Sequence, residues 1–180
     1  QDAIHHRKNA LTLLTELSAD EPEDVNYHFD LFMNHLLMGH LLRGSDKLAE
    51  YELALREIEF VSQRKPNNPD YQDAQNALNM TLARQFMVGG EKDKRRAHSL
   101  CEAAMQSSAR LARQYPKKPL YGKYIPQGHQ ILGGLAAMKG DLPTFKEEYR
   151  KAIQAHHEIA QKLSLQSNLT QRGDWLHEEW

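Results

Sequence analysis

Three tyrosines open matching stretches of the chain, and this recurrence constrains the fold more than any other feature. Tyr27, Tyr71 and Tyr121 are separated by 44 and then by 50 residues. About 17 residues after each tyrosine the chain has a glycine break. The breaks are Gly44, Gly89-Gly90 and Gly140. A second apolar pattern follows each break and ends in a polar stretch, so each unit predicts a helix, a tight turn and another helix.

The second helix of each unit carries a regular apolar stripe. In the first unit its members step by three or four residues, which places them on one helical face. They are Leu48, Tyr51, Leu55, Ile58 and Val61. The first helices are apolar over a wider arc, as expected of a helix that is flanked on two sides. No single pair can bury such faces alone, so the pairs are expected to stack.

The residues at the expected helix ends agree with this division. Asn68 suits a helix N-cap because Pro69 follows it, at a position where the missing N–H costs nothing. Asp24 and Asp141 stand at equivalent starts, and glycine at each break suits a left-handed turn. Pro126 conflicts with a continuous helix, which therefore either begins near Ile125 or is kinked there.

The sequence predicts an all-α fold, a right-handed helical solenoid of about seven antiparallel helices in one repeat domain, 1–180. Residues 1–21 are interpreted as the orphan second helix of a preceding unit. Three units follow, at 22–66, 67–116 and 117–167. Gly173-Asp174-Trp175 suggests that 168–180 begin a truncated further unit or a cap. The absence of an initiator Met suggests a piece of a longer protein.

The third unit resembles the tetratricopeptide repeat (TPR) family in its lengthened bacterial form. The Leu132-Gly133 pair, followed seven residues later by Gly140, is similar to the family's Leu-Gly pair and turn glycine. Phe145, Tyr149 and Ala152 occupy slots that the family fills with alanine, an aromatic residue and alanine. Gly133 would let the two helices approach closely. The second unit departs from the pattern, and the units are longer than the family's usual ~34 residues.

The resemblance implies a non-catalytic scaffold that binds a peptide or protein segment on a concave face lined by the first helices. Similar repeats are attached to bacterial serine/threonine kinases and other signalling proteins, so a larger signalling protein is the expected context. By position, the resemblance implies the following contact residues: Asn34, Met38, Leu41, Asn76, Asn79, Ala83, Phe86, Gln127, Gln130 and Gly134.

Composition narrows the classes of partner. The chain has 23 basic and 24 acidic residues and a formal charge of −1, whereas a protein that neutralises many phosphates needs a basic excess. No apolar run approaches the ~20 residues that cross a bilayer. The expected partners are therefore protein or peptide, with no nucleic acid and no membrane, and the expected location is the cytoplasm. The single cysteine, Cys101, lies on an apolar stripe and is expected to be a packed thiol.

Catalytic and metal-binding patterns are weak. The ten histidines include no His-Glu-x-x-His or Glu-x-x-His spacing. His98 and Glu102, four apart, suit a surface ion pair, and His156 lies on an apolar stripe that favours a core histidine. We therefore expect no enzyme activity and no cofactor. Two alternatives stay open: self-association through terminal helices, and a helical-bundle metal or small-ligand protein.

Overall fold

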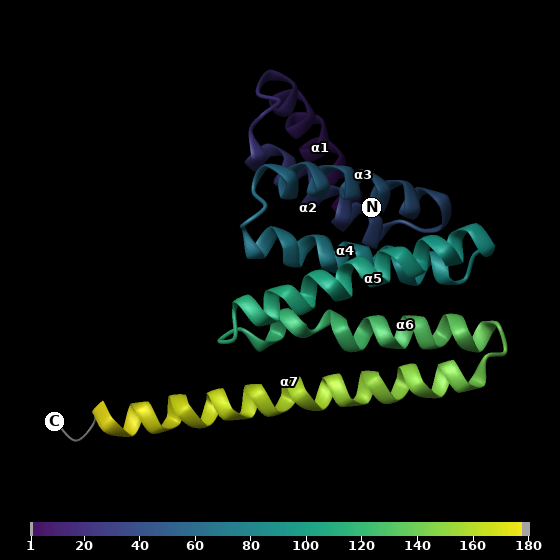
Figure 1. Cartoon of the computed structure of the whole chain (residues 1–180). Helices are drawn as coiled ribbons and strands as arrows, with labels where there is room; N and C mark the ends of the chain where they lie inside the picture. Colours follow the sequence, from purple (N-terminus) through teal and green to yellow (C-terminus); the bar gives the residue numbers. More distant parts are fainter. Residues whose placement is uncertain (1, 178–180) are drawn as a thin grey trace. The chain divides into compact units, whose positions relative to one another are not determined.

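The computed structural model describes residues 2–177, with side chains from residue 4 to residue 165, and all elements in this range are helices. The helices are α1 (Asp2–Asp20), α2 (Val25–Leu41), α3 (Gly44–Arg64), α4 (Pro69–Met87), α5 (Glu91–Gln114), a 3-10 turn η1 (Pro119–Gly122), α6 (Tyr124–Met138) and α7 (Leu142–His177) (Figure 1). The all-α prediction is confirmed.

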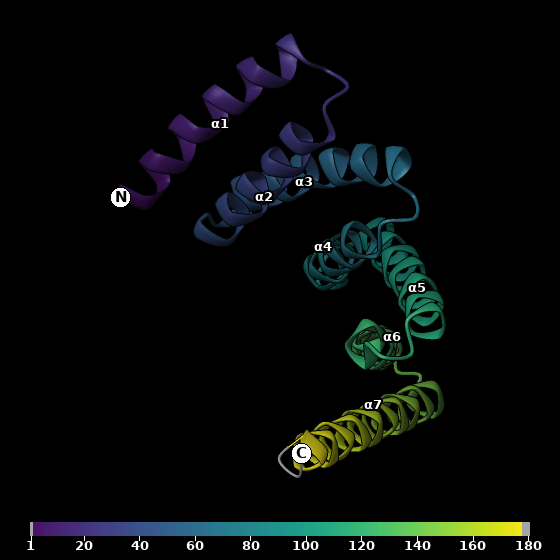
Figure 2. The same ribbon diagram turned by 90° about the vertical axis from the view of Figure 1, so that its left-hand side faces the viewer.

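The chain divides into two compact units, Gln1–Gln85 and Phe86–Trp180, and the boundary falls near the end of α4. In unit 1, α2 and α3 form an antiparallel hairpin with a core that includes Phe32, Tyr51 and Ile58. A hydrogen bond of 2.9 Å from Arg7 to Asn34 Oδ1 ties α1 to α2. Unit 2 contains a second hairpin, α6–α7, whose helices lie side by side in both ribbon views (Figures 1 and 2).

The expected caps are present where the sequence predicted them. Asp24 Oδ1 accepts from the Asn26 backbone N–H at 2.7 Å, and Asn68 Oδ1 accepts from Asp70 at 2.9 Å. Asp141 Oδ1 accepts from the Thr144 backbone N–H at 3.1 Å. Each bond satisfies an N–H group that a helix start leaves unpaired.

The predicted left-handed turns occur at two of the three glycine breaks. Gly44 has φ 60° and Gly140 has φ 75°, a region that other residues adopt only with strain. The prediction is wrong for Gly89-Gly90, because neither residue has positive φ and Gly90 is the extended N-cap of α5. There the Asp93 carboxylate accepts the Gly90 N–H at 3.2 Å, which caps the start of α5.

Two helix boundaries differ from expectation. Residues Pro119–Gly122, expected to begin the first helix of the third unit, form the 3-10 turn η1, and α6 starts only at Tyr124. Pro126 therefore lies in the first turn of α6, where its missing N–H needs no partner, and the first of the two alternatives is correct. Helix α7 continues past the polar stretch 166–168 to His177. The side chains of 166–177, and residues 178–180 entirely, lie outside the described part, which includes the Trp175 side chain of the expected truncated unit or cap.

Candidate functional site

In each unit a histidine–carboxylate bridge joins the two helices of a hairpin at a matching position. In unit 1, His35 Nδ1 on α2 lies 2.7 Å from Glu50 Oε2 on α3. In unit 2, His129 Nδ1 on α6 lies 2.7 Å from Glu148 Oε2 on α7. All four side chains are mostly buried, between 12% and 19% exposed, so each bridge is shielded from competing water.

A close backbone approach accompanies each bridge. A Cβ added to Gly39 would lie 2.4 Å from the Tyr51 ring, and one added to Gly133 would lie 2.8 Å from the Tyr149 ring. The expectation that Gly133 permits close helix approach is thereby confirmed. Both hairpins thus combine a glycine under a tyrosine ring with a His–Glu bridge.

The two hairpins share a sequence motif that explains this geometry. The first helix reads His-x-x-x-Gly-x-Leu at 35–41 and at 129–135, and the second reads Glu-Tyr-x-x-Ala at 50–54 and at 148–152. From the motif glycine to the motif glutamate the count is 11 residues in the first hairpin and 15 in the second. The second hairpin is therefore longer at its tip by four residues, about one helical turn.

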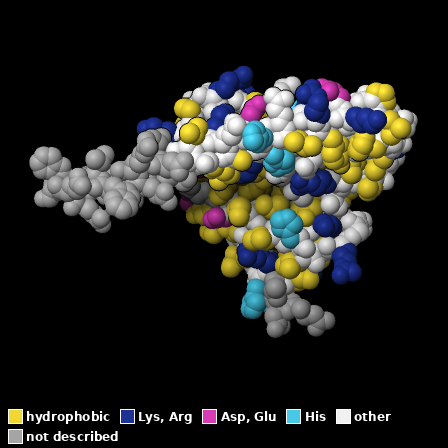
Figure 3. Space-filling model, turned by 90° about the horizontal axis from the view of Figure 1, so that it is seen from below, with side chains coloured by type: hydrophobic (Ala, Val, Ile, Leu, Met, Phe, Trp, Pro, Cys, Tyr) yellow, Lys and Arg dark blue, Asp and Glu magenta, His cyan; other side chains and the backbone are white. Residues whose placement is uncertain are grey.

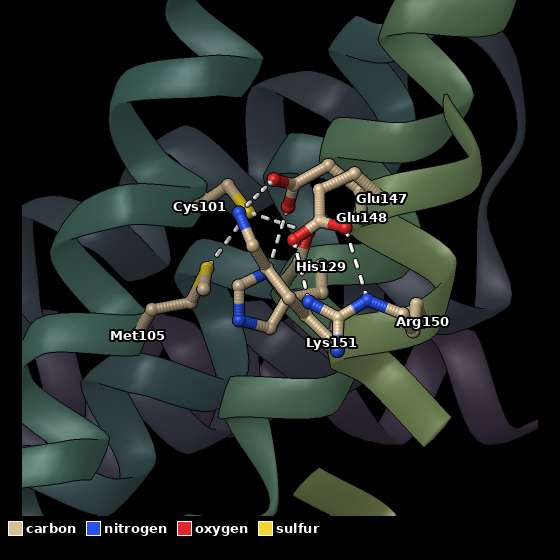
Figure 4. A network of polar contacts seen from close by, with 8 residues as sticks. Cys101, Met105, His129, Glu147, Glu148, Arg150 and Lys151 are labelled. Carbon is tan, nitrogen blue, oxygen red and sulfur yellow. Dashed lines mark hydrogen bonds and ion pairs between the residues drawn. The ribbon is translucent and has the colours of Figure 1, made fainter. Parts of the chain in front are cut away.

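Glu148 is the centre of a small polar network in unit 2 (Figure 4). Besides the bridge to His129, it accepts a hydrogen bond of 2.8 Å from Lys151 Nζ. Burial acts to raise the pKa of Glu148, but the hydrogen bonds from Lys151 and His129 outweigh it and hold the pKa below its usual value. The neighbouring Glu147 instead pairs outward with Arg150 at 2.8 Å. Glu148 is thus an ionised group that its neighbours hold in place.

Cys101 lies close to Glu148 and His129 in the same view (Figure 4). Its thiol is fully buried and lies 3.2 Å from the Gly128 carbonyl oxygen, to which it donates. The predicted packed thiol is confirmed. A thiol enclosed in this way has no access for a substrate, so the arrangement does not suit nucleophilic catalysis.

A groove lies beside the network, between α5 and the α6–α7 hairpin, and we name it the α5–α6–α7 groove. It consists of two adjoining cavities of about 200 and about 160 Å³. The larger is lined by His98, Leu132, Leu135, Ala136, Lys139, Asp141, Thr144 and Glu148. The smaller is lined by Glu91, Lys94, Arg95, His98, Leu135 and Lys139. The wall of the α5–α6–α7 groove therefore combines apolar side chains of α6 with charged groups from all three helices.

Half of the ten predicted contact residues are buried. They are Met38, Asn76, Asn79, Ala83 and Phe86. Such side chains offer little surface to a partner, because packing within the protein already covers them. The amides are peculiar in one respect: Asn76 Nδ2 and Asn79 Oδ1 are buried without a hydrogen-bond partner among the described residues. Each such atom costs on the order of 1–3 kcal/mol.

The other five predicted residues retain some accessible surface. Leu41 and Gln130 are exposed, and Asn34, Gln127 and Gly134 are half-buried. Asn34 is engaged by Arg7 of α1. None of the ten lines the α5–α6–α7 groove, so the structure does not bring the predicted residues together there. A binding role for these residues stays a prediction.

One of the two predictions for single histidines is confirmed and the other is wrong. His98 pairs with Glu102 at 3.2 Å, as predicted, but His156 is exposed, and its interpretation as a core residue is wrong because α7 turns that side outward. His28 adds a third bridge, to Glu57 at 2.6 Å. Within the described range, no three histidine, cysteine or acidic side chains converge as a metal site would require.

Sequence reasoning missed both the bridges and the groove. The bridging residues lie 15 and 19 positions apart on separate helices, a spacing that no single-helix pattern reveals. The paired motifs His-x-x-x-Gly-x-Leu and Glu-Tyr-x-x-Ala were the available signal. The groove needs side chains from three helices, so only the packing of the unit reveals it.

Comparison of the chain with protein-family models, with curated proteins and with solved structures finds no match. Among the described helices, none has the length and apolar character needed to cross a bilayer.

Proposed function

We propose that this chain is a non-catalytic interaction module that binds a peptide or protein segment, and that it does so in the α5–α6–α7 groove. The observation that carries the proposal is the groove itself, an open depression with apolar side chains at its base and charged side chains of both signs around it. Segment-binding surfaces typically have such an apolar centre and polar rim. The groove thus replaces the concave-face residues as the favoured site.

The recurrence of one hairpin design supports the wider proposal of a TPR-like solenoid. Helical repeats of this class stack similar hairpins and use the resulting surface for binding. The His–Glu bridge and the glycine–tyrosine contact recur in both units at matching motif positions. Membership of a larger signalling protein and a cytoplasmic location rest on the resemblance and on the sequence, and we retain them as proposals.

A steric block of the groove tests the binding proposal. His98 lines both cavities and its side chain is half exposed, so His98→Trp fills the groove without disturbing the core. We expect dodecapeptides selected from a random display library on the wild-type chain to bind His98→Trp at least about tenfold more weakly, measured by fluorescence anisotropy. Gln106→Trp is the matched control, because Gln106 is an exposed residue of α5 outside the groove.

The two variants must first show wild-type helicity and melting by circular dichroism. Equal binding of the selected peptides to wild type, His98→Trp and Gln106→Trp would show that the groove is not the site. A failure of the library to yield any peptide that depends on His98 would have the same meaning.

Self-association is a second candidate, because α7 presents apolar side chains outward. Leu142, Tyr149 and Ile153 lie seven and four residues apart, which places them on one side of the helix, and Ile153 is 69% exposed. The space-filling view shows surface hydrophobic side chains interspersed with lysine, arginine and histidine (Figure 3). A second copy of the same helix in antiparallel orientation would cover such a stripe by symmetric pairing.

A charge placed in the stripe tests this candidate. If copies pair through α7, sedimentation equilibrium of the wild type shows a dimer, and Ile153→Glu weakens it by at least about tenfold, since a buried unpaired carboxylate is costly. Gln154→Glu adds the same charge at the next position and should leave the dimer intact. A wild-type monomer at the highest accessible concentration would exclude the candidate.

A further inference from the structure

The acidic groups of the α5–α6–α7 groove are all engaged within the protein. Glu91 accepts a hydrogen bond of 3.0 Å from Lys94, which is the main reason that its pKa is lowered. Asp141 caps α7 through Thr144, and hydrogen bonds from the Thr144 side chain and backbone lower its pKa. Glu148 is held by His129 and Lys151. Glu91 and Glu148 are therefore each paired with a lysine, whereas Asp141 is bonded only to the neutral Thr144 and keeps its negative charge in the larger cavity.

Two basic side chains line the groove without an ion-pair partner among the described residues. Arg95 on α5 and Lys139 at the end of α6 are exposed and both line the 160 Å³ cavity. Neither side chain makes a salt bridge or hydrogen bond with any residue in the described part of the chain. Both lower the pKa of Glu91 through space, so they lie near it without binding it. The smaller cavity therefore offers positive charge to a ligand, because Glu91, its acidic residue, already pairs with Lys94.

Apolar surface lies directly beside these two cations. Leu135 borders both cavities, and Leu132 and Ala136 line the larger one. Leu135 and Ala136 are themselves buried, whereas Leu132 is only half-buried and is the aliphatic side chain that a ligand can cover. Covering it contributes to affinity, at about 25 cal/mol for each Å² of apolar surface removed from water.

We infer that the partner segment of the groove presents a carboxylate side chain next to an aliphatic one, the carboxylate lying between Arg95 and Lys139 and the aliphatic group against Leu132. This inference rests on the proposed function and specifies its ligand. The guanidinium of Arg95 can donate two parallel hydrogen bonds to a carboxylate, and the ammonium of Lys139 adds a point charge from a second helix. The smaller cavity disfavours a basic side chain, because Arg95 and Lys139 would repel it there.

The sequences selected from the random dodecapeptide library give the first test. We expect them to be enriched in Asp or Glu adjacent to Leu, Ile or Val. Replacement of that acidic residue by its amide should weaken binding about tenfold, in line with the loss of a hydrogen bond to a charged group. Raising the salt concentration should weaken binding of the acidic peptides, because exposed charge pairs are screened.

The second test changes the protein. Arg95→Gln/Lys139→Gln removes both unpaired cations while keeping the side chains long, and should weaken the acidic peptides about tenfold or more. Lys92→Gln/Lys146→Gln is the matched control, since both lysines are exposed and lie outside the groove, Lys92 on α5 with Arg95 and Lys146 on α7. It removes the same charge and should change binding less than about twofold, because it acts only through the long-range field.

The outcomes separate this inference from the proposed function. Peptides that need an open groove but lack acidic enrichment, and that bind both double variants equally, would overturn the inference and leave the binding function standing. Equal weakening by the two double variants would also overturn it, because general charge and not this site would then be responsible. If no selected peptide is sensitive to His98→Trp, both proposals fall.

Discussion

Replacement of Gly39 by valine is expected to destabilise the protein by about 3 kcal/mol, the upper part of the usual range for overpacking a core. Any Cβ at this position would lie 2.4 Å from two carbon atoms of the Tyr51 ring. Tyr51 is only 1% exposed, so its ring has no free space to move into. The helices α2 and α3 would have to separate. Urea denaturation followed by circular dichroism measures the effect.

Gly133→Val is the matched control in the second hairpin. A Cβ there would lie 2.8 Å from the Tyr149 ring, but Tyr149 is 40% exposed and can swing toward solvent. We expect this variant to lose about 1 kcal/mol. If the two glycine variants were equally destabilised, the burial of the tyrosine would not be the deciding factor, and the contrast between the hairpins would be wrong.

Truncation of Glu148 to alanine is expected to destabilise the protein by about 2 kcal/mol, because it leaves His129 and Lys151 without their shared acceptor. His129 is 18% exposed, so water replaces the carboxylate only in part. The control is Glu147→Ala, one residue away, whose exposed pair with Arg150 should contribute little. Chemical denaturation at neutral pH should show Glu147→Ala close to the wild type and Glu148→Ala clearly below it.

The difference between wild type and Glu148→Ala should depend on pH with a definite sign. The pKa of Glu148 is lowered in the folded protein from its ordinary 4.5, so folding favours the ionised form. The stabilisation is therefore full above pH 4.5 and is lost as the pH falls through the lower folded pKa. We expect the two denaturation curves to converge on acidification below that range. A gap that widened toward acid pH would contradict the assignment.

The sequence was sufficient for most of the helix boundaries because local chemistry determines them. Asp24, Asn68 and Asp141 cap helices as predicted, and Gly44 and Gly140 adopt the left-handed conformation. Each of these features depends on a few neighbouring residues. An exception is Gly89-Gly90, where neither glycine has positive φ and Gly90 is the extended N-cap of α5, a difference that the glycine pattern alone does not reveal.

The candidate site could not be predicted from the sequence, because the burial of a side chain depends on how the helices pack. Asn76 and Asn79 look like exposed amides on a helix surface, yet α4 is covered on the side that carries them. Periodicity identifies the faces of a helix but does not say which faces other helices cover. The groove was likewise hidden, since Arg95 and Lys139 are 44 positions apart in the chain and become neighbours of one cavity only when α5 and α6 pack.

The four additional residues in the α6–α7 hairpin have a consequence for protein engineering. They lie between the motif glycine and the motif glutamate, the part of the hairpin that also contains Lys139, Asp141 and Thr144 of the groove. In both hairpins, the His–Glu bridge and the contact between the glycine and the tyrosine ring hold the two helices together, and the residues that form them lie outside this segment. Because these contacts flank the tip, we expect that residues 136–147 can be grafted in place of 42–49, which would transfer Lys139, Asp141 and Thr144 to the α2–α3 hairpin while its bridge and its glycine–tyrosine contact are kept.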